Sequence, residues 1–218
     1  MPKKCIRLNT RKLEKDNLLL IFTRNPELGK CKTRLASVIG NESALEIYKF
    51  LLARTSEITK GLEADKAVFY SDNVVVDDLW DNQHYNKREQ RGQDLGERML
   101  NAFQWGFEQG YQKILIIGSD LYDLSSEDLK TAFKALEKNE FVIGPASDGG
   151  YYLLGMKQLK KELFQDKSWG KASVLEDTLK DLKGQSLQLL EIRNDVDLYE
   201  DIKDIDVFQK FLKKTYDQ

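Results

Sequence analysis

Short apolar runs of strand length alternate with longer segments of helical pattern along most of this chain. The runs Leu18–Phe22, Ala67–Tyr70 and Lys113–Ile117 contain few polar residues. A strand without a polar face is buried on both sides, which is typical of parallel sheets. Between the runs, apolar residues recur at helical spacing over about residues 41–59, 94–109, 125–136 and 173–182. The alternation therefore predicts an α/β domain whose mostly parallel sheet is covered on both faces.

The stretch Gly144–Gly155 reads GPASDGGYYLLG and lies between two further apolar runs. Asp-Gly between strand-like segments is a strong hairpin signal, so Phe141–Ile143 and Tyr151–Leu154 are predicted to pair. A last strand is predicted over Leu187–Ile192 and a terminal helix over Tyr199–Lys213.

The chain has 218 residues, 41% hydrophobic and 32% charged, which fits one soluble domain. We expect a polar tail over residues 1–17 and a single domain over residues 18–218. The net charge of -2 predicts no nucleic-acid partner. The run Leu18–Phe22 is too short to span a membrane, and the tail lacks the features of a secretory signal. The two cysteines make no disulfide framework. A cytoplasmic protein is the simplest interpretation, with its oligomeric state open.

His84 is the single histidine and lies in a polar stretch, where a solvated loop residue is expected. Mechanisms that need several histidines, or a serine or cysteine paired with one, would all depend on it. Catalysis is therefore expected to use carboxylates, basic residues and a hard metal ion.

Ligands of such sheets bind beyond the carboxyl ends of the strands. A glycine turn at Gly29, followed by Lys30, Lys32 and Arg34, comes after the first strand. It is not a Walker loop, because Arg24 and Cys31 stand where that motif needs glycine and serine or threonine. The cluster predicts phosphate binding, and a solvated basic loop is an equally good interpretation.

Carboxylates follow two other strands. Asp120 comes just past Ile117, where it could bind Mg²⁺ or Mn²⁺ bridging substrate phosphates, whereas a structural role is favoured for Asp123. Asp195 and Asp197 could present two carboxylates to one ion, or cap the terminal helix.

A fourth segment, Gly92–Met99, opens a helix. Its backbone amides, including that of Gly96, could contact a nucleotide, although Asp94 is equally a plain N-cap.

Taken in order, five motifs resemble a known family. They are LLLIFTRNPELGKCKTRLA, GQDLGERM, GSDLYDL, GPASDGGYYLLGM and DVDLYEDI, and they cover about Leu18 to Ile202. The family is that of glycosyltransferase-like bacterial proteins of the nucleotide-diphospho-sugar transferase superfamily, of the radical-SAM/selenium-domain-associated type. It is related to guanylyltransferases of molybdenum-cofactor and phospholactate chemistry. Two departures stand out: the Gly118–Asp123 turn lacks the family's proline, and Cys31 replaces a small aliphatic residue.

The resemblance implies a GT-A type, Rossmann-like α/β/α sandwich with a mixed sheet and a divalent cation, Mg²⁺ or Mn²⁺, below a nucleotide diphosphate. It implies that Lys32 and Arg34 contact phosphates, with Gly29 and Gly96 in the nucleotide site. Asp120 would be the metal aspartate, completed by Asp197. Asp148, Gly149 and Gly150 would line the sugar or acceptor side.

We therefore expect a metal-dependent transferase that uses a nucleotide-activated sugar as donor, with Asp120 and Asp148 as catalytic candidates. Asp148 would orient an acceptor or act as a base, and a plain turn aspartate is the alternative. One other hypothesis is a nucleotidyltransferase that joins an NTP to a phosphorylated acceptor. Another is a nucleotide-binding protein without turnover. The expected partners are a nucleotide sugar or NTP and an unidentified acceptor.

Overall fold

The computed structural model describes residues 15–212, and the polar tail predicted over residues 1–17 lies mostly outside them. Within the described residues the strands form one seven-stranded sheet in the order β3-β2-β1-β4-β6-β5-β7. Only β6 runs against its neighbours. The predicted α/β class with a mostly parallel mixed sheet is confirmed. The strands are β1 (Lys15–Thr23), β2 (Asp65–Tyr70), β3 (Asn86–Glu89), β4 (Tyr111–Gly118), β5 (Phe141–Pro145), β6 (Tyr151–Met156) and β7 (Leu187–Leu189).

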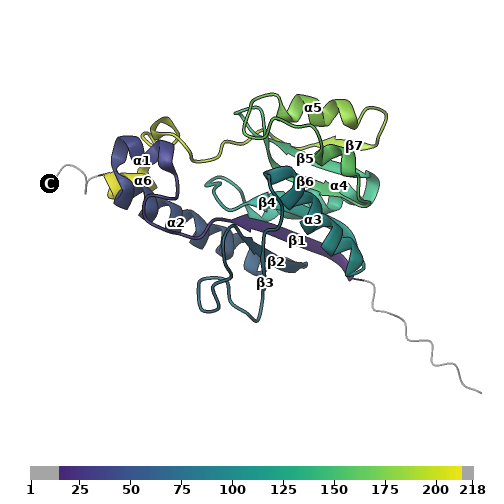
Figure 1. Cartoon of the computed structure of the whole chain (residues 1–218), viewed down its shortest axis with the longest axis horizontal. Helices are drawn as coiled ribbons and strands as arrows, with labels where there is room; N and C mark the ends of the chain where they lie inside the picture. The colour runs from purple at the N-terminus through teal and green to yellow at the C-terminus, as the bar shows by residue number, and fades with distance from the viewer. Residues whose placement is uncertain (1–14, 213–218) are drawn as a thin grey trace, which may run out of the picture.

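Helices cover both faces of the sheet. Side chains of α2 and α4 pack on one face and those of α3, η1 and α5 on the other, while α1 and α6 lie beyond one end of the sheet (Figure 1). No helix among residues 15–212 has the length and apolar character needed to cross a membrane. The helices are α1 (Thr33–Ile39), α2 (Asn41–Lys60), α3 (Leu95–Glu108), α4 (Ser126–Lys138), α5 (Val174–Asp181) and α6 (Asp206–Leu212), with 3-10 turns η1 (Lys161–Phe164) and η2 (Tyr199–Asp201).

The central strand β1 shows why the sequence favours this arrangement. Leu18 and Leu20 pack into the core on one face, whereas Leu19 and Ile21 pack into the core on the other. Successive side chains of a strand point to opposite faces, so a wholly apolar run contributes to both cores at once.

Local signals also place the helix starts as predicted. The Asp94 side chain accepts a hydrogen bond from Glu97 N at 2.8 Å and caps α3. Ser125 and Asp128 form a capping box before α4, which satisfies backbone N–H groups that the helix leaves free.

The predicted hairpin is present. β5 and β6 pair antiparallel, with Ile143 opposite Leu154, and β6 pairs antiparallel with β4. β5 is consequently parallel to β4, and its carboxyl end lies at the same edge of the sheet as the carboxyl ends of β1, β2 and β4. The residues that follow these strands share that edge.

Two boundaries and two short elements differ from expectation. β1 begins at Lys15, so residues 15–17 belong to the strand and not to the tail. β7 ends at Leu189; Leu190 N still bonds Ile143 O, but Arg193 then pairs with Ala146, one residue out of the β7 register. The strand β3 carries no apolar residue and the helix α1 is only seven residues long, so periodicity predicts neither.

The terminal helix predicted over Tyr199–Lys213 is wrong, and Lys213 lies outside the described residues. A 3-10 turn at Tyr199–Asp201 and a turn separate it from α6. Ile202 and Phe208 are both fully buried in the same cluster. Residues six apart do not share a helical face, so the break is what lets both reach this core.

Candidate functional site

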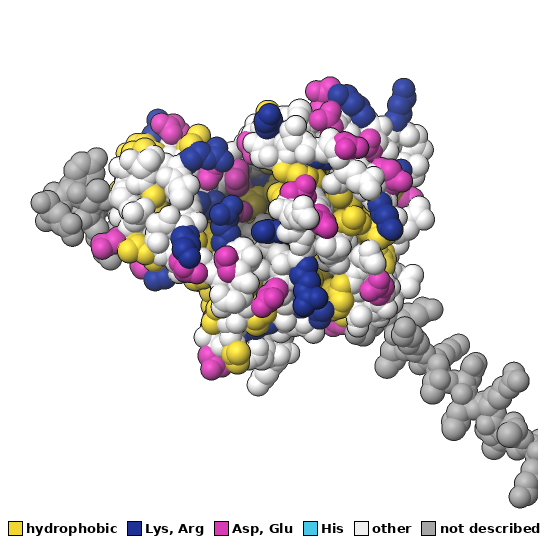
Figure 2. Space-filling model, viewed as in Figure 1, with side chains coloured by type: hydrophobic (Ala, Val, Ile, Leu, Met, Phe, Trp, Pro, Cys, Tyr) yellow, Lys and Arg dark blue, Asp and Glu magenta, His cyan; other side chains and the backbone are white. Residues whose placement is uncertain are grey.

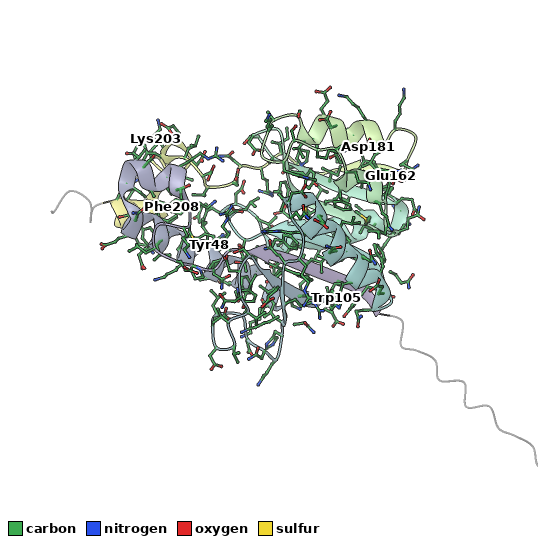
Figure 3. The ribbon with its side chains drawn as sticks, in the orientation of Figure 1. Tyr48, Trp105, Glu162, Asp181, Lys203 and Phe208 are labelled. Carbon is green, nitrogen blue, oxygen red and sulfur yellow. The ribbon has the colours of Figure 1, made fainter. Side chains whose placement is uncertain are left out.

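Buried hydroxyl groups connect the carboxyl ends of β1 and β4. The two strands are neighbours, with Phe22 opposite Gly118. The Tyr48 hydroxyl, from α2, accepts a hydrogen bond from Arg24 N at 2.8 Å and lies 3.3 Å from Thr23 Oγ1 and 3.4 Å from Ser119 Oγ. Figure 3 shows Tyr48 at this junction. The segments that follow the two strands are thereby held side by side.

The segment from residue 24 to residue 32 is anchored by short polar contacts. Asn25 Nδ2 donates to Asn73 O at 2.8 Å, and Asn25 Oδ1 accepts from Asp72 N at 3.2 Å. The buried Cys31 thiol donates to Asn25 O at 3.2 Å. Cys31 thus holds the loop in shape, which gives a structural account of the residue that departs from the family pattern.

Lys32 precedes α1 in the left-handed backbone region, with φ 50° and ψ 46°. Few non-glycine residues adopt this region. The side chain is only 6% exposed, and its Nζ lies 2.7 Å from Asp120 Oδ2. Burial lowers the pKa of Lys32, but the carboxylates of Asp120, Asp197 and Asp195 raise it more, so the pKa is raised overall. The ammonium therefore stays charged among these carboxylates.

Arg34 lies on the first turn of α1 and forms an ion pair with Asp197, at 2.5 Å between Nη2 and Oδ2. The Arg34 side chain is 71% exposed. An exposed ion pair is weak and readily exchanged, so the guanidinium is available to an anion that enters the site.

Asp195 is held next to Asp120. Leu121 and Asp195 form an antiparallel bridge, and Val196 N donates to Asp120 O at 3.2 Å. Burial raises the pKa of Asp195, and the Asp120 carboxylate raises it further, to about 6, against the opposing effect of Lys32. The Asp120 carboxylate thus affects the pKa of Asp195 more than the Lys32 ammonium does.

These residues line a cleft with two adjoining parts that share Asp120 and Asp195. The basic part has a volume of about 680 Å³ and is lined by Arg24, Lys30, Lys32 and Arg34 among others. The apolar part has a volume of about 240 Å³. Figure 2 shows basic and acidic side chains gathered in a hollow between the α1/α6 end and the rest of the molecule.

The hairpin turn reaches this cleft, as the sequence predicted. Asp148 and Gly150 line the apolar part. Asp148 Oδ1 also accepts a hydrogen bond from Gly150 N at 2.8 Å, which is the turn role considered as the alternative. Gly149 has φ 89°, and a Cβ there would lie 2.3 Å from the carbonyl oxygen of Ala172. Gly149 is therefore needed for packing against the chain before α5.

Gly29 and Gly96, the two glycines expected in the nucleotide site, are not among the residues that line the cleft. Gly29 occupies the turn that precedes Lys30. A Cβ on Gly96 would lie 2.5 Å from both Phe164 O and Trp169 Nε1. Gly96 therefore allows α3 to pack closely on η1 and the segment after it.

The apolar wall of the cleft is not predicted from the sequence. That wall includes Met99 from α3, Tyr151 from β6 and Trp169 from the loop before α5. Met99 belongs to the motif GQDLGERM and Tyr151 to GPASDGGYYLLGM. Their pattern in the sequence indicates only a helix residue and a strand residue. No local signal marks Trp169, because its place depends on the packing of η1 and α5.

A divalent cation fits Asp120 and Asp195 by charge and by ligand type. Among residues 15–212 no group of three or more His, Cys, Asp or Glu side chains is arranged to hold a metal. Mg²⁺ commonly uses one or two protein carboxylates and takes its other ligands from substrate phosphates and water. Such an ion would offset the repulsion between the carboxylates of Asp120 and Asp195.

The fold and the cleft place the chain among proteins with the α/β fold of nucleotide-diphospho-sugar transferases. A crystal structure from Desulfovibrio desulfuricans G20, whose provisional name is nucleotide-diphospho-sugar transferase, superposes with a TM-score of 0.81. It is 30% identical in sequence, and the match covers 92% of this chain and 95% of that one. A family model matches residues 55–171, more than half of the chain. The chain belongs to that family, DUF2064, described as "uncharacterized protein conserved in bacteria".

More distant structures share the fold alone. One is 4-diphosphocytidyl-2C-methyl-D-erythritol synthase from Anaerococcus prevotii, at 10% identity and a TM-score of 0.60, covering 90% of this chain and 97% of that one. Another is a cytidylyltransferase from Leptospira borgpetersenii, at 15% identity and a TM-score of 0.57, covering 86% and 83%. No protein with a curated function matches the sequence.

Proposed function

We propose that the protein is a metal-dependent transferase that uses a nucleotide-activated sugar as its donor. The observation that carries the proposal is the Lys32–Asp120 ion pair at the junction of β1 and β4, with Asp195 beside it in the same cleft. The likeness to the Desulfovibrio structure supports a nucleotide sugar as the class of donor.

In this proposal the basic part of the cleft holds the nucleotide diphosphate. The Lys32 ammonium and the exposed Arg34 guanidinium bind the phosphate oxygens, and charge-assisted bonds of this kind are about twice as strong as neutral ones. Asp120 and Asp195 hold Mg²⁺ or Mn²⁺. Arg34 exchanges its ion pair with Asp197, which lies at the cleft wall, for contacts with the phosphates. The ion, when bound, supplies positive charge that stabilises a leaving diphosphate.

The apolar part of the cleft then receives the sugar or the acceptor. Asp148 and Gly150 line it, and Asp148 is the side chain that we assign to orienting the acceptor. Its carboxylate has one oxygen bonded to Gly150 N, so the second oxygen is the one that would accept a proton or a hydrogen bond from an acceptor hydroxyl.

A second candidate is a nucleotidyltransferase that joins an NTP to a phosphorylated acceptor. Five basic side chains line the cleft, those of Arg24, Lys30, Lys32, Arg34 and Arg98. That number suits a triphosphate as well as a diphosphate. The product separates the two candidates, because nucleotidyl transfer releases pyrophosphate and glycosyl transfer releases a nucleoside diphosphate.

The first test is thermal stabilisation by nucleotides. Sugar nucleotides, NTPs and nucleoside diphosphates are added with and without Mn²⁺, and a ligand that binds the folded state raises the Tm. We expect a rise that depends on Mn²⁺ and is lost in Asp120→Asn and Asp195→Asn. Full metal-dependent stabilisation in both variants would contradict the assigned metal site.

The second test measures turnover with the ligand that stabilises most. Release of nucleoside diphosphate in the presence of cell-extract acceptors supports glycosyl transfer, and pyrophosphate release from an NTP supports nucleotidyl transfer. Binding without either product would favour a nucleotide-binding protein that lacks turnover. The Asp148→Asn variant is expected to bind nucleotide normally and to lose turnover.

A further inference from the structure

A second basic groove lies beside the cleft, between β3 and α3. It has a volume of about 500 Å³, and the side chains that carry the argument are Arg88, Arg91, Arg98 and Trp105. Arg98 lines both this groove and the basic part of the cleft, so the two hollows adjoin. Trp105 lies on α3, well apart from Tyr48 in the view of Figure 3.

The three arginines lack carboxylate partners. Within residues 15–212 no ion pair joins Arg88, Arg91 or Arg98 to an Asp or Glu. Of the other charged groups in the groove, Lys87 is paired with Asp78 at 2.7 Å and Glu89 is exposed. The groove therefore has a clear excess of positive charge, although the whole chain has a net charge of -2.

Packing holds the Arg88 side chain in place. The Arg88 guanidinium carbon lies 4.3 Å from the centre of the Trp105 ring, a cation–π arrangement that fixes its plane. Burial lowers the pKa of Arg88, and the nearby charge of Arg91 lowers it further. Two cations that repel each other are thus kept close by contacts with α3.

The backbone of this segment is also tied to α3. Asn101 Nδ2 donates to Arg91 O at 2.8 Å, and Arg98 Nε donates to Gly92 O at 3.1 Å. These bonds hold the backbone of Arg91 near Arg88. They therefore reduce the loss of conformational entropy that ligand binding to this segment would cost.

We propose that this groove is a binding site for a phosphate group, held by Arg88 and Arg91 with Arg98 at the boundary to the cleft. Planar guanidinium groups suit the paired oxygens of a phosphate, and a bound dianion would neutralise the repulsion between them. The phosphate belongs either to a separate small ligand or to a ligand that extends out of the cleft. This site is additional to the proposed nucleotide site, and its existence does not depend on the transferase reaction.

The test follows Trp105 fluorescence while pyrophosphate is added to the full chain at constant ionic strength. A Trp105→Phe variant shows which part of the fluorescence change comes from Trp105, because this variant keeps Trp80 and Trp169. We expect a saturable change, with the affinity reduced at least about tenfold in Arg88→Gln and in Arg91→Gln. Lys130→Gln removes an exposed positive charge on α4 and serves as the matched control, with unchanged affinity.

The Arg91→Gln variant also protects the test from a folding defect, because Arg91 is exposed and Arg88 packs on Trp105. Absence of a saturable change, or equal affinity in all four proteins, would overturn the proposal. Adding a saturating nucleotide first distinguishes the two sources of phosphate. Competition assigns the groove to a ligand that extends from the cleft, and simultaneous binding assigns it to a separate ligand.

Discussion

Lys32 combines an unfavourable backbone conformation with a nearly buried ion pair to Asp120. Backbone strain of this kind costs on the order of 1–3 kcal/mol and is common at functional sites. The ion pair is the compensation visible in the structure. A residue chosen only to begin α1 would be a small polar cap, and Lys32 makes no side-chain capping bond to the helix.

The Lys32→Asn variant separates backbone conformation from charge. Asparagine tolerates the left-handed region, so the loop is expected to keep its path while the ammonium is lost. Nucleotide affinity measured by calorimetry is expected to fall at least about tenfold, the effect of losing one charge-assisted hydrogen bond. Lys49→Gln removes an exposed positive charge from α2 and should leave affinity unchanged. Equal affinity in the two variants would show that the Lys32 ammonium does not contribute to nucleotide binding.

A second residue-scale prediction concerns Gly149. The Gly149→Ala variant combines φ 89° with a 2.3 Å approach to Ala172 O, whereas Gly184→Ala meets a similar φ of 83° in open space. We expect Gly184→Ala to lose about 1–2 kcal/mol in the free energy of unfolding and Gly149→Ala to lose more. Urea denaturation gives both values. Similar losses in the two variants would mean that the loop before α5 can shift away from a Cβ at position 149 with little loss of stability.

At the scale of elements, Arg193 connects the segment after β7 to the start of α4. Its Nη2 donates to Asp128 Oδ1 at 2.6 Å, while Ser125 N donates to Asp128 Oδ2 at 2.8 Å. Burial raises the pKa of Asp128, but the bonds from Ser125 and Arg193 lower it more, so it lies below its usual value of 3.8. The ionised carboxylate therefore stabilises the folded state.

This contribution sets a pH dependence. It is fully present above pH 3.8 and is lost as the pH falls through the lower pKa of the folded state. Asp128→Asn is expected to lower the free energy of unfolding at pH 7 by about 1–3 kcal/mol and to make stability fall less steeply below pH 4. Asp123→Asn, which removes a more exposed partner of Arg193 at 3.2 Å, should change both quantities less. Parallel acid-denaturation curves for Asp128→Asn and the unaltered protein would contradict the assignment.

At the scale of the whole molecule, the segment that ends in α6 completes the site although it is far from it in sequence. Phe208 is fully buried with Leu35 of α1 and Ile47 of α2, and Figure 3 shows it in this lobe at one end of the sheet. Leu35 follows Arg34, so the packing of α6 positions a side chain of the proposed phosphate site.

Phe208→Ala is expected to loosen that lobe. Loss of a buried phenylalanine costs about 3–5 kcal/mol, and hydrogen exchange should accelerate in residues 33–39 more than in residues 174–181. Nucleotide affinity should fall with it, because Arg34 loses its fixed support. Lys203→Ala, which shortens an exposed side chain in the turn before α6, is the control. Equal acceleration in both segments would show that the lobe does not open separately.

The sequence by itself determined most of the strands, most of the helices and the residues that follow those strands. Leu18–Ile21 and Ile114–Ile117 are wholly apolar. Runs of this kind are buried on both faces, which is typical of interior strands of a parallel sheet. Asp94, Ser125 and Asp128 signal helix starts within a few residues, since capping is a local interaction. Because ligands of such sheets lie beyond the carboxyl ends of the strands, Lys32, Asp120 and Asp148 could be placed at one edge.

Only the tertiary structure decided how those side chains meet. Asp195 lies beside Asp120 because the chain after β7 returns to form a bridge at Leu121, and Gly96 is required by Trp169, whose place depends on η1 and α5. The groove at Arg88 and Trp105 likewise needs the pairing of β3 with β2 and the packing of α3. These contacts join residues far apart in sequence. Their geometry follows from the order of strands and the close packing of the core, and no local pattern encodes either.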